Sequence, residues 1–318
     1  MQKRTLGRNG SLLTVVGFGA WAIGGPWRFG WGPVDDGESI RAIQRGLDLG
    51  INWIDTAAIY GFGHSEEIVG KAIRGRRDKV FVATKCGILP DGKGGSVRSS
   101  SPASIRREVE ASLKRLGVDV IDLYQIHFPE KTTPYEESWG AMLKLKEEGK
   151  VRHVGVSNYD IPKLERCATL AFPQSLQPPF SLLRRDIEKE ILPYCRDNGI
   201  GVVAYSPMQA GLLSGSFDLT KTAPDDWRRN DPMFQEPRLS RHLEFVEAIR
   251  PVARELHVTV GQLAIAWVLT HPGITSAIVG ARRPAQVEEN ARAGELVLSA
   301  DTLKEIENIH SRIFRSDS

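Results

Sequence analysis

Cysteine is scarce in this sequence of 318 residues. Cys86, Cys167 and Cys195 are odd in number and far apart, so they do not form the paired framework of a small disulfide-bonded domain. No cysteine or histidine pair has the spacing of a metal site, and we expect no metal. Long hydrophobic runs are also missing. The longest, residues 263–269, is far shorter than the roughly 20 residues that span a bilayer.

An excess of charge of one sign is absent too. The chain has 42 Lys and Arg against 39 Asp and Glu, a net charge of +3. A balance of this kind gives no reason to expect a nucleic-acid partner or an acidic membrane surface. No apolar run follows the basic residues near the N-terminus, so we expect no secretory leader and a cytoplasmic location. The composition leaves the oligomeric state open.

Short runs rich in β-branched residues alternate with amphipathic stretches along the whole chain. Residues 39–49, 102–116 and 135–148 have apolar residues at helical spacing. The eight predicted strands are residues 15–18, 52–55, 80–83, 120–124, 151–156, 175–177, 201–205 and 275–279. Alternation of strands and helices indicates parallel strands joined by crossovers, and eight such units favour a closed (β/α)8 TIM barrel. No linker divides the chain, so we expect residues 1–318 to form one domain.

Three segments do not fit the repeating unit. Residues 3–16, with Asn9-Gly10 at their centre, predict a β-hairpin outside the barrel. Residues 87–101 follow the third strand and residues 209–240 follow the seventh, and both are too long for simple turns. Both long loops are expected on the face where barrel enzymes carry their active sites.

Reactive side chains recur where the predicted strands end. Asp55 ends the second strand with Tyr60 just after it, Lys85 ends the third and His127 ends the fourth. Strand ends of a barrel converge on one site, so these four groups can meet without being close in sequence. Each alone has an ordinary structural explanation, such as a helix cap or a half-buried aromatic. Their joint placement favours a catalytic site.

These residues belong to a set of short motifs that run in order along nearly the whole chain. The motifs are GFGAW (17–21), DTAAIYG (55–61), TK (84–85), YQIH (124–127), GVSNY (155–159), AYSP (204–207), and GAR (280–282) with EN (289–290). In this order they are specific, and the sequence resembles the aldo-keto reductase superfamily. The best match is the bacterial branch related to potassium-channel β subunits.

The resemblance implies an NADPH-dependent oxidoreductase that reduces aldehydes or ketones to alcohols. Tyr60 would give a proton to the carbonyl oxygen while hydride reaches the carbon. A phenol has an ordinary pKa of about 10, and Lys85 would lower it by favouring the tyrosinate. Asp55 would keep Lys85 charged and in place. His127 would orient the substrate oxygen, and Trp21 and Phe128 would complete the substrate-binding set with Tyr60 and His127.

The same resemblance places the cofactor NADP across the top of the barrel. Tyr205 would stack on the nicotinamide, and Arg282, at a helix start, would bind the ribose 2′-phosphate. The implied cofactor-binding residues are Ala20, Trp21, Asp55, Ser157, Asn158, Gln177, Tyr205, Ser206, Pro207, Met208, Gly211, Leu212, Gly280, Arg282, Gln286, Glu289 and Asn290. Ser157, Asn158 and Gln177 would hold the carboxamide.

The sequence departs from the family pattern at two positions. Phe180 stands where relatives usually have tyrosine, and Ser216 stands where many have a lysine near the pyrophosphate. Arg228 and Arg229 in the second long loop could compensate by folding over the cofactor.

Aromatic residues follow the first strand and favour a carbonyl substrate with an apolar or aromatic body over a highly charged one. Trp27, Phe29 and Trp31 either wall this pocket or pack beneath the loop.

Two other functions remain open. One is an NADP-binding regulatory or sensor protein with slow turnover, against which His127 argues because the channel-related group tends to lack it. The other is an NAD-dependent sugar or polyol dehydrogenase.

Overall fold

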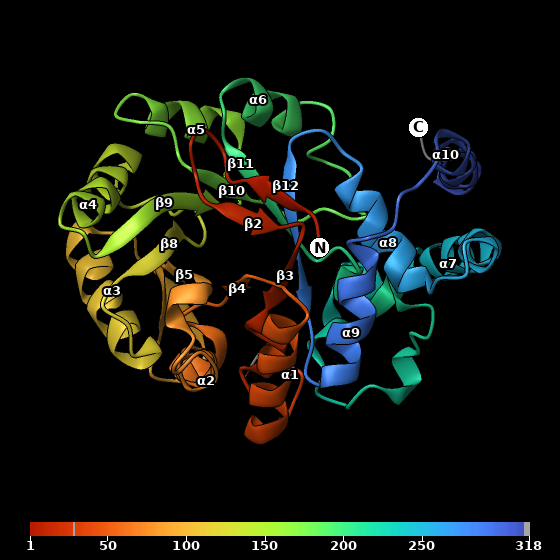
Figure 1. Ribbon diagram of the computed structural model, residues 1–318, viewed down its shortest axis with the longest axis horizontal. Coiled ribbons are helices and arrows are strands. Elements are labelled where there is room, and N and C mark those ends of the chain that lie inside the picture. Colours follow the sequence, from red (N-terminus) through yellow and green to blue (C-terminus); the bar gives the residue numbers. More distant parts are fainter. Residues whose placement is uncertain (28, 315–318) are drawn as a thin grey trace.

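The computed structural model describes residues 1–27 and 29–314. Its centre is a closed barrel of eight strands in which each strand pairs in parallel with its neighbours (Figure 1). The barrel strands are β3 (Val16–Gly19), β4 (Trp53–Asp55), β5 (Phe81–Cys86), β8 (Ile121–Ile126), β9 (Val151–Ser157), β10 (Ser175–Gln177), β11 (Gly201–Tyr205) and β12 (Ile274–Gly280). The predicted (β/α)8 barrel is confirmed.

Helices surround the barrel as an outer layer (Figure 1). They are α1 (Asp36–Asp48), α2 (His64–Ala72), α3 (Pro102–Leu116), α4 (Tyr135–Glu147), α5 (Ile161–Ala168), α6 (Ile191–Asp197), α7 (Arg238–Glu255), α8 (Val260–Leu269), α9 (Pro284–Ala293) and α10 (Ala300–Phe314). The last helix packs on α7, with Phe245 and Phe314 5.6 Å apart between ring centroids. Among the described residues no helix combines the length and the apolar character needed to cross a membrane.

Local sequence signals explain where several helices begin. Side-chain oxygens of Asp35, Ser101 and Asp160 accept backbone N–H groups in the first turns of α1, α3 and α5. Thr259 and Gln262 form a reciprocal capping box at the start of α8. Such caps satisfy N–H groups that have no partner within the helix.

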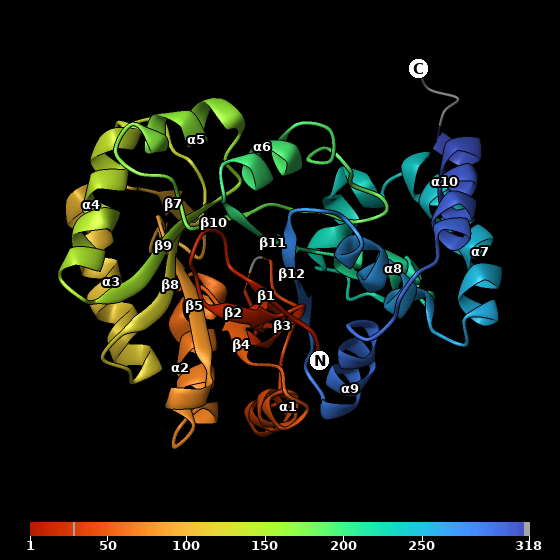
Figure 2. The same ribbon diagram turned by 45° about the horizontal axis from the view of Figure 1, so that its top comes forward.

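The N-terminal hairpin closes one end of the barrel. Strands β1 (Lys3–Thr5) and β2 (Leu12–Thr14) pair antiparallel and cross the end of the cylinder in both Figure 1 and Figure 2. Leu6 and Leu13 are fully buried against Trp53 and other interior side chains. The indole N–H of Trp53 donates to the Thr14 carbonyl at 3.1 Å. The predicted hairpin therefore closes this end of the barrel with apolar side chains and leaves the opposite end open to a ligand.

The two long loops at that opposite end are more ordered than their composition indicates. Residues 87–101 contain a small hairpin of β6 (Ile88–Pro90) and β7 (Ser96–Arg98). The glycine- and serine-rich composition of this segment indicated only a loop. Residues 209–240 form four 3₁₀ helices, of which the first is η4 (Gln209–Ser214). Leu212, Phe234 and Leu239 give this second loop a small core of its own.

A buried carboxylate anchors the β6–β7 hairpin to α3. Glu108 is 6% exposed and accepts the backbone N–H of Gly87 at 2.9 Å and the hydroxyl of Ser104 at 2.9 Å. Burial raises the pKa of Glu108 from 4.5 to about 7, against the opposing effect of these hydrogen bonds. The folded state therefore binds a proton at this carboxyl over a pH range in which an unfolded chain has lost it.

We expect Glu108 to make the protein less stable as the pH rises from about 5 to about 8. The stabilising contribution of the protonated carboxyl is complete below its unfolded pKa and is lost as the pH passes about 7, a change of about 3 kcal/mol. In Glu108→Gln this component should vanish, as measured by urea unfolding at both pH values. The control is Glu110→Gln, an exposed position on the same helix, which should keep the wild-type dependence. Equal pH dependence of wild type and Glu108→Gln would contradict the assignment.

Candidate active site

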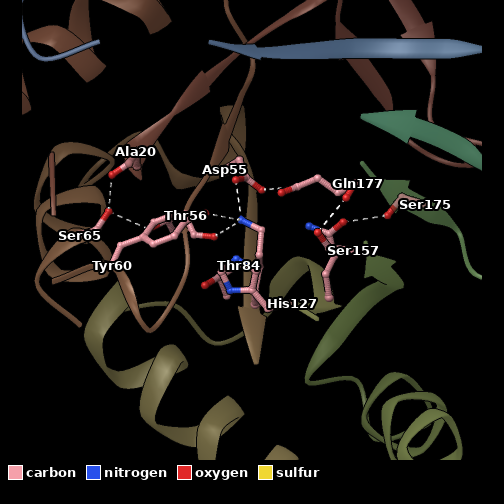
Figure 3. Close-up of polar contacts among 12 residues, drawn as sticks. Ala20, Asp55, Thr56, Tyr60, Ser65, Thr84, His127, Ser157, Ser175 and Gln177 are labelled. Atoms are coloured by element: carbon pink, nitrogen blue, oxygen red, sulfur yellow. Dashed lines mark hydrogen bonds and ion pairs between the residues drawn. The ribbon is translucent and has the colours of Figure 1, made fainter. Parts of the chain in front are cut away.

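Side chains from adjacent strands meet at the open end of the barrel (Figure 3). Asp55 ends β4 and Lys85 lies in β5. The Lys85 Nζ atom is 2.6 Å from Asp55 Oδ1 and 3.3 Å from the Tyr60 hydroxyl oxygen. It also donates to the Thr56 carbonyl at 2.8 Å. The structure thus brings three of the four predicted catalytic groups into direct contact.

Tyr60 is placed by a turn that requires glycine. It begins the 3₁₀ helix η2 (Tyr60–Gly63), in which Gly61 has φ of 60°. A Cβ atom on Gly61 would lie 1.8 Å from the Gly24 carbonyl oxygen, so no side chain fits there. Glycine tolerates both the positive φ and the close approach. The turn therefore packs on the segment after β3 and directs the phenol toward Lys85.

The ion pair between Lys85 and Asp55 is buried and internally balanced. The two residues are 1% and 3% exposed, and the second carboxylate oxygen of Asp55 accepts the Gln177 amide N–H at 2.8 Å. Burial lowers the pKa of Lys85 and raises the pKa of Asp55, and each partner's charge opposes the shift of the other. A buried charge that lost its partner here would be strongly destabilising.

Tyr60 differs from its predicted state. Burial raises the pKa of Tyr60 well above its ordinary value, and the Asp55 carboxylate raises it further. The expectation that Lys85 lowers the pKa of Tyr60 is therefore wrong for the free protein. The physical reason is that the Asp55 carboxylate, 2.6 Å from Lys85 Nζ, compensates the ammonium charge. Desolvation therefore remains the dominant effect on the pKa of the phenol. Tyr60 keeps its proton at neutral pH.

His127 completes the group from the end of β8. Its ring lies 5.8 Å from the Tyr60 ring, edge to face. Burial, with the positive charges of Lys85 and Arg98, lowers the pKa of His127 well below its ordinary value. The imidazole is therefore neutral at physiological pH, and one ring nitrogen can donate a hydrogen bond to a substrate oxygen.

The residues predicted to hold a nicotinamide lie at the next strand ends. Asn158 has φ of 62°, and its amide nitrogen donates to the His127 carbonyl at 3.0 Å. Its amide oxygen accepts the Tyr205 hydroxyl at 2.9 Å, while the Ser157 hydroxyl donates to the Gln177 carbonyl at 2.8 Å. Because the Asn158 amide nitrogen also donates to the Ser157 hydroxyl at 2.9 Å, the side chains of Ser157, Asn158 and Tyr205 form one network, which the backbone carbonyl of Gln177 anchors to β10.

A cavity of about 1350 Å³ covers this end of the barrel. It is larger than most small-molecule pockets, which run to about 1000 Å³, so it has room for a dinucleotide and a substrate together. The predicted site residues that line it are Trp21, Asp55, Tyr60, His127, Phe128, Ser157, Asn158, Gln177, Tyr205, Ser206, Pro207, Met208, Gly211, Gly280, Arg282 and Gln286. Trp27, Phe29 and Trp31 also line it, so the aromatic cluster forms pocket wall.

Four predicted cofactor residues are not brought to the cavity wall. Ala20 and Leu212 are fully buried, and Leu212 belongs to the core of the second long loop. Glu289 accepts the Thr259 hydroxyl at 2.8 Å. The Asn290 amide donates to the Gly280 carbonyl at 3.2 Å, which fixes the end of β12. Position in the sequence pattern therefore does not distinguish residues that line the cavity from residues that lie behind the lining.

Two arginines meet at the far end of the cavity. The guanidinium of Arg228 lies 4.3 Å from the Trp31 ring centroid and that of Arg282 lies 6.0 Å from it. Arg228 pairs with Asp226 at 2.6 Å. Among residues 1–27 and 29–314 no carboxylate pairs with Arg282, whose bonds run to the Trp31 carbonyl. Burial and then the neighbouring arginines lower the pKa of Arg282, as expected of a cation that lacks an anionic partner.

The departures from the family pattern have distinct outcomes. Phe180 is fully buried and packs on Trp267 at 5.2 Å, so it contributes no group to the cavity. Ser216 lines the cavity. Arg228 reaches the cavity as proposed from the sequence, but Arg229 binds backbone carbonyls of its own loop, such as Thr222 at 2.7 Å.

Sequence reasoning missed several wall residues. Trp227 lies 5.7 Å from Trp21, and Phe217 lies within cation–π distance of Arg228. Arg98, from the small hairpin after β5, also lines the cavity. Their only signal was membership of a long loop on the catalytic face, which does not indicate which side chains turn inward.

Comparison with known proteins agrees with the geometry. The model of the Aldo/keto reductase family matches residues 15–311. The chain therefore belongs to the aldo-keto reductase family and is an oxidoreductase of that family, whose members use a nicotinamide cofactor.

Individual relatives cover almost the full length. Aldo-keto reductase YhdN of Bacillus subtilis is 40% identical, over 97% of this chain and 93% of its own. The NADH-specific methylglyoxal reductase of Escherichia coli is 38% identical over 94% and 95%. Among solved structures, the glycerol dehydrogenase AKR11B4 from Gluconobacter oxydans superposes with a TM-score of 0.89 at 40% identity, over 98% and 95%. The predicted bacterial branch is confirmed, and the relation to channel β subunits stays a prediction.

Proposed function

We propose that the protein reduces aldehydes or ketones to alcohols with NADPH and with Tyr60 as the general acid. The observation that carries the proposal is a protonated phenol whose oxygen lies 3.3 Å from the Lys85 ammonium. A neutral imidazole, His127, faces the same cavity. A carbonyl oxygen between these two groups would receive one hydrogen bond from each.

The chain's own residues would act on the developing oxyanion. Tyr60 holds its proton until negative charge builds on the carbonyl oxygen, and then transfers it. Lys85 lies behind the phenol and stabilises the phenolate that remains, since its contact with the oxygen strengthens as that charge appears. His127 donates a hydrogen bond to the same substrate oxygen. Asp55 keeps Lys85 fixed throughout.

The cavity fits a nicotinamide dinucleotide. Gln177 donates its amide N–H to Asp55, and its amide oxygen has no partner among the described residues, which leaves an acceptor for a carboxamide N–H. Tyr205 would lie against the nicotinamide ring. When bound, the reduced nicotinamide supplies hydride. Arg282, a cation without a carboxylate partner in the described part of the chain, would hold the 2′-phosphate that distinguishes NADPH from NADH.

A second candidate is a polyol dehydrogenase working in the oxidative direction. It is favoured by the 40% identity to the glycerol dehydrogenase AKR11B4. The same four groups would serve both directions: in the reverse, Tyr60 acts as the base and accepts the proton of the alcohol hydroxyl, while the alcohol carbon gives up hydride to the oxidised nicotinamide. Measuring kcat/KM for glycerol oxidation and for aldehyde reduction shows which of the two reactions the enzyme favours. Tight NADPH binding without turnover on any carbonyl would instead favour the sensor.

Tyr60→Phe should remove most of the activity. Loss of the proton donor is expected to lower kcat by about 10²–10⁴, because general acid catalysis contributes that much. NADPH binding should be unchanged, since the ring and the Lys85–Asp55 pair remain. The measurement is the loss of NADPH absorbance with nitrobenzaldehyde, and NADPH affinity by fluorescence.

The matched control for this variant is Tyr194→Phe, on α6 and outside the cavity lining. It should retain wild-type kcat. A Tyr60→Phe enzyme with kcat within about threefold of wild type would refute the assignment of Tyr60 as general acid.

Arg282→Ala should weaken NADPH binding by about tenfold or more and leave NADH binding nearly unchanged, because only NADPH carries the 2′-phosphate. Affinities for the two cofactors, measured by fluorescence titration, give the selectivity. Arg283→Ala is the matched control, since Arg283 is exposed and lies 3.6 Å from Glu38. Unaltered NADPH affinity in Arg282→Ala would remove the basis for preferring NADP.

A further inference from the structure

The β6–β7 hairpin brings a positive charge to the substrate side of the cavity. The guanidinium of Arg98, in β7, lies 4.5 Å from the Phe128 ring centroid. The Phe128 ring stacks in turn on His127, with 5.4 Å between centroids and 23° between planes. One wall of the cavity therefore carries a row of four planar groups in successive contact: Arg98, Phe128, His127 and Tyr60.

Nothing in the described part of the chain neutralises Arg98. Its hydrogen bond runs to the Pro129 carbonyl at 3.5 Å, the limit of such a contact, and no carboxylate within the described residues forms an ion pair with it. The nearby Glu130 is turned to other partners and accepts the backbone N–H groups of Ser100 and Thr133. The positive charge of Arg98 is felt at His127, whose pKa it helps to lower.

Among the described residues, the other cations of the cavity wall either have a carboxylate partner or lie at its far end. Asp55 is paired with Lys85, and Arg228 with Asp226. Arg184, which also lines the cavity, has Asp186 at 3.4 Å. Arg282 lies at the far end against Trp31. Of the residues that the structure describes, Arg98 is thus the cation that lies beside the reacting groups without a carboxylate partner.

We propose that Arg98 is a specificity-determining residue that binds the carboxylate of the substrate. The proposal rests on the function proposed above, and it defines the substrate class as aldehydes that carry one carboxylate about one aromatic ring away from the carbonyl. The spacing follows from the wall: the carbonyl oxygen would lie at Tyr60 and His127, the body of the substrate would lie alongside Phe128, and the carboxylate would reach the guanidinium. A planar guanidinium binds a carboxylate through two parallel N–H bonds.

The test compares 3- and 4-carboxybenzaldehyde with benzaldehyde, which has the same body without the charge. Arg98→Met keeps an apolar cover on Phe128 but removes the charge. The ratio of kcat/KM for the carboxylated over the neutral aldehyde should fall at least about tenfold in this variant, mainly through KM. Arg98→Lys should retain part of the ratio. Raising the salt concentration should lower the ratio in wild type and not in Arg98→Met, because salt screens an exposed charge pair.

Arg184→Met is the matched control and should keep the wild-type ratio. An unchanged ratio in Arg98→Met would overturn the proposal. An equal loss on both aldehydes would overturn it too, because it would mean that Arg98 only positions the hairpin. If wild type turns over neither aldehyde, the proposed function fails separately. Calorimetric binding of 4-carboxybenzaldehyde then decides the role of Arg98: weaker binding to Arg98→Met supports it, and equal binding refutes it.

Discussion

The buried ion pair between Lys85 and Asp55 is the constraint on which the rest of the site depends. Neither charge is tolerable alone at this depth, and the pair is stable because Thr56 and Gln177 satisfy its remaining polar atoms. Three strands, β4, β5 and β10, must therefore end at the same level of the barrel. The consequence for the chemistry is a phenol beside an ammonium whose charge is already balanced. Tyr60 stays protonated in the free protein, and the ammonium stabilises the phenolate once its proton has left.

The fold separates stability from chemistry along the barrel axis. Apolar side chains and the N-terminal hairpin fill one end around Trp53, so this end contributes the burial of apolar surface that favours folding. The polar end is then free to carry buried charges, positive φ at Asn158, and a glycine turn at Gly61, none of which favours folding by itself. The long loops add the walls: the β6–β7 hairpin is held by Glu108 on one side of the cavity, and residues 209–240 have their own small core on the other.

Most of the architecture could be predicted from the sequence, because β-branched runs and helical periodicity are local signals. The eight strands were each predicted to within about three residues, and the convergence of Asp55, Tyr60 and Lys85 followed from parallel strand ends. The direction of the Tyr60 pKa shift could not be predicted, because it depends on the distance between Asp55 and Lys85 and on burial. The hairpin that carries Arg98 was also missed, since glycine and serine obscure its short strands. The resemblance placed Ala20 and Leu212 at the cofactor, but both side chains are buried, and periodicity alone does not give side-chain direction in a loop.

The protonation state of Tyr60 can be measured by ultraviolet titration, as the difference between the absorbance of wild type and that of Tyr60→Phe across the pH range. We expect no tyrosinate absorbance from Tyr60 at neutral pH, because its pKa is raised; the signal should emerge only above the ordinary phenol pKa of about 10. In Asp55→Asn, where the Lys85 charge is no longer compensated, the same signal should move to lower pH. A Tyr60 tyrosinate already present near neutral pH in the wild-type protein would show instead that the Lys85 charge outweighs burial and Asp55 at the phenol.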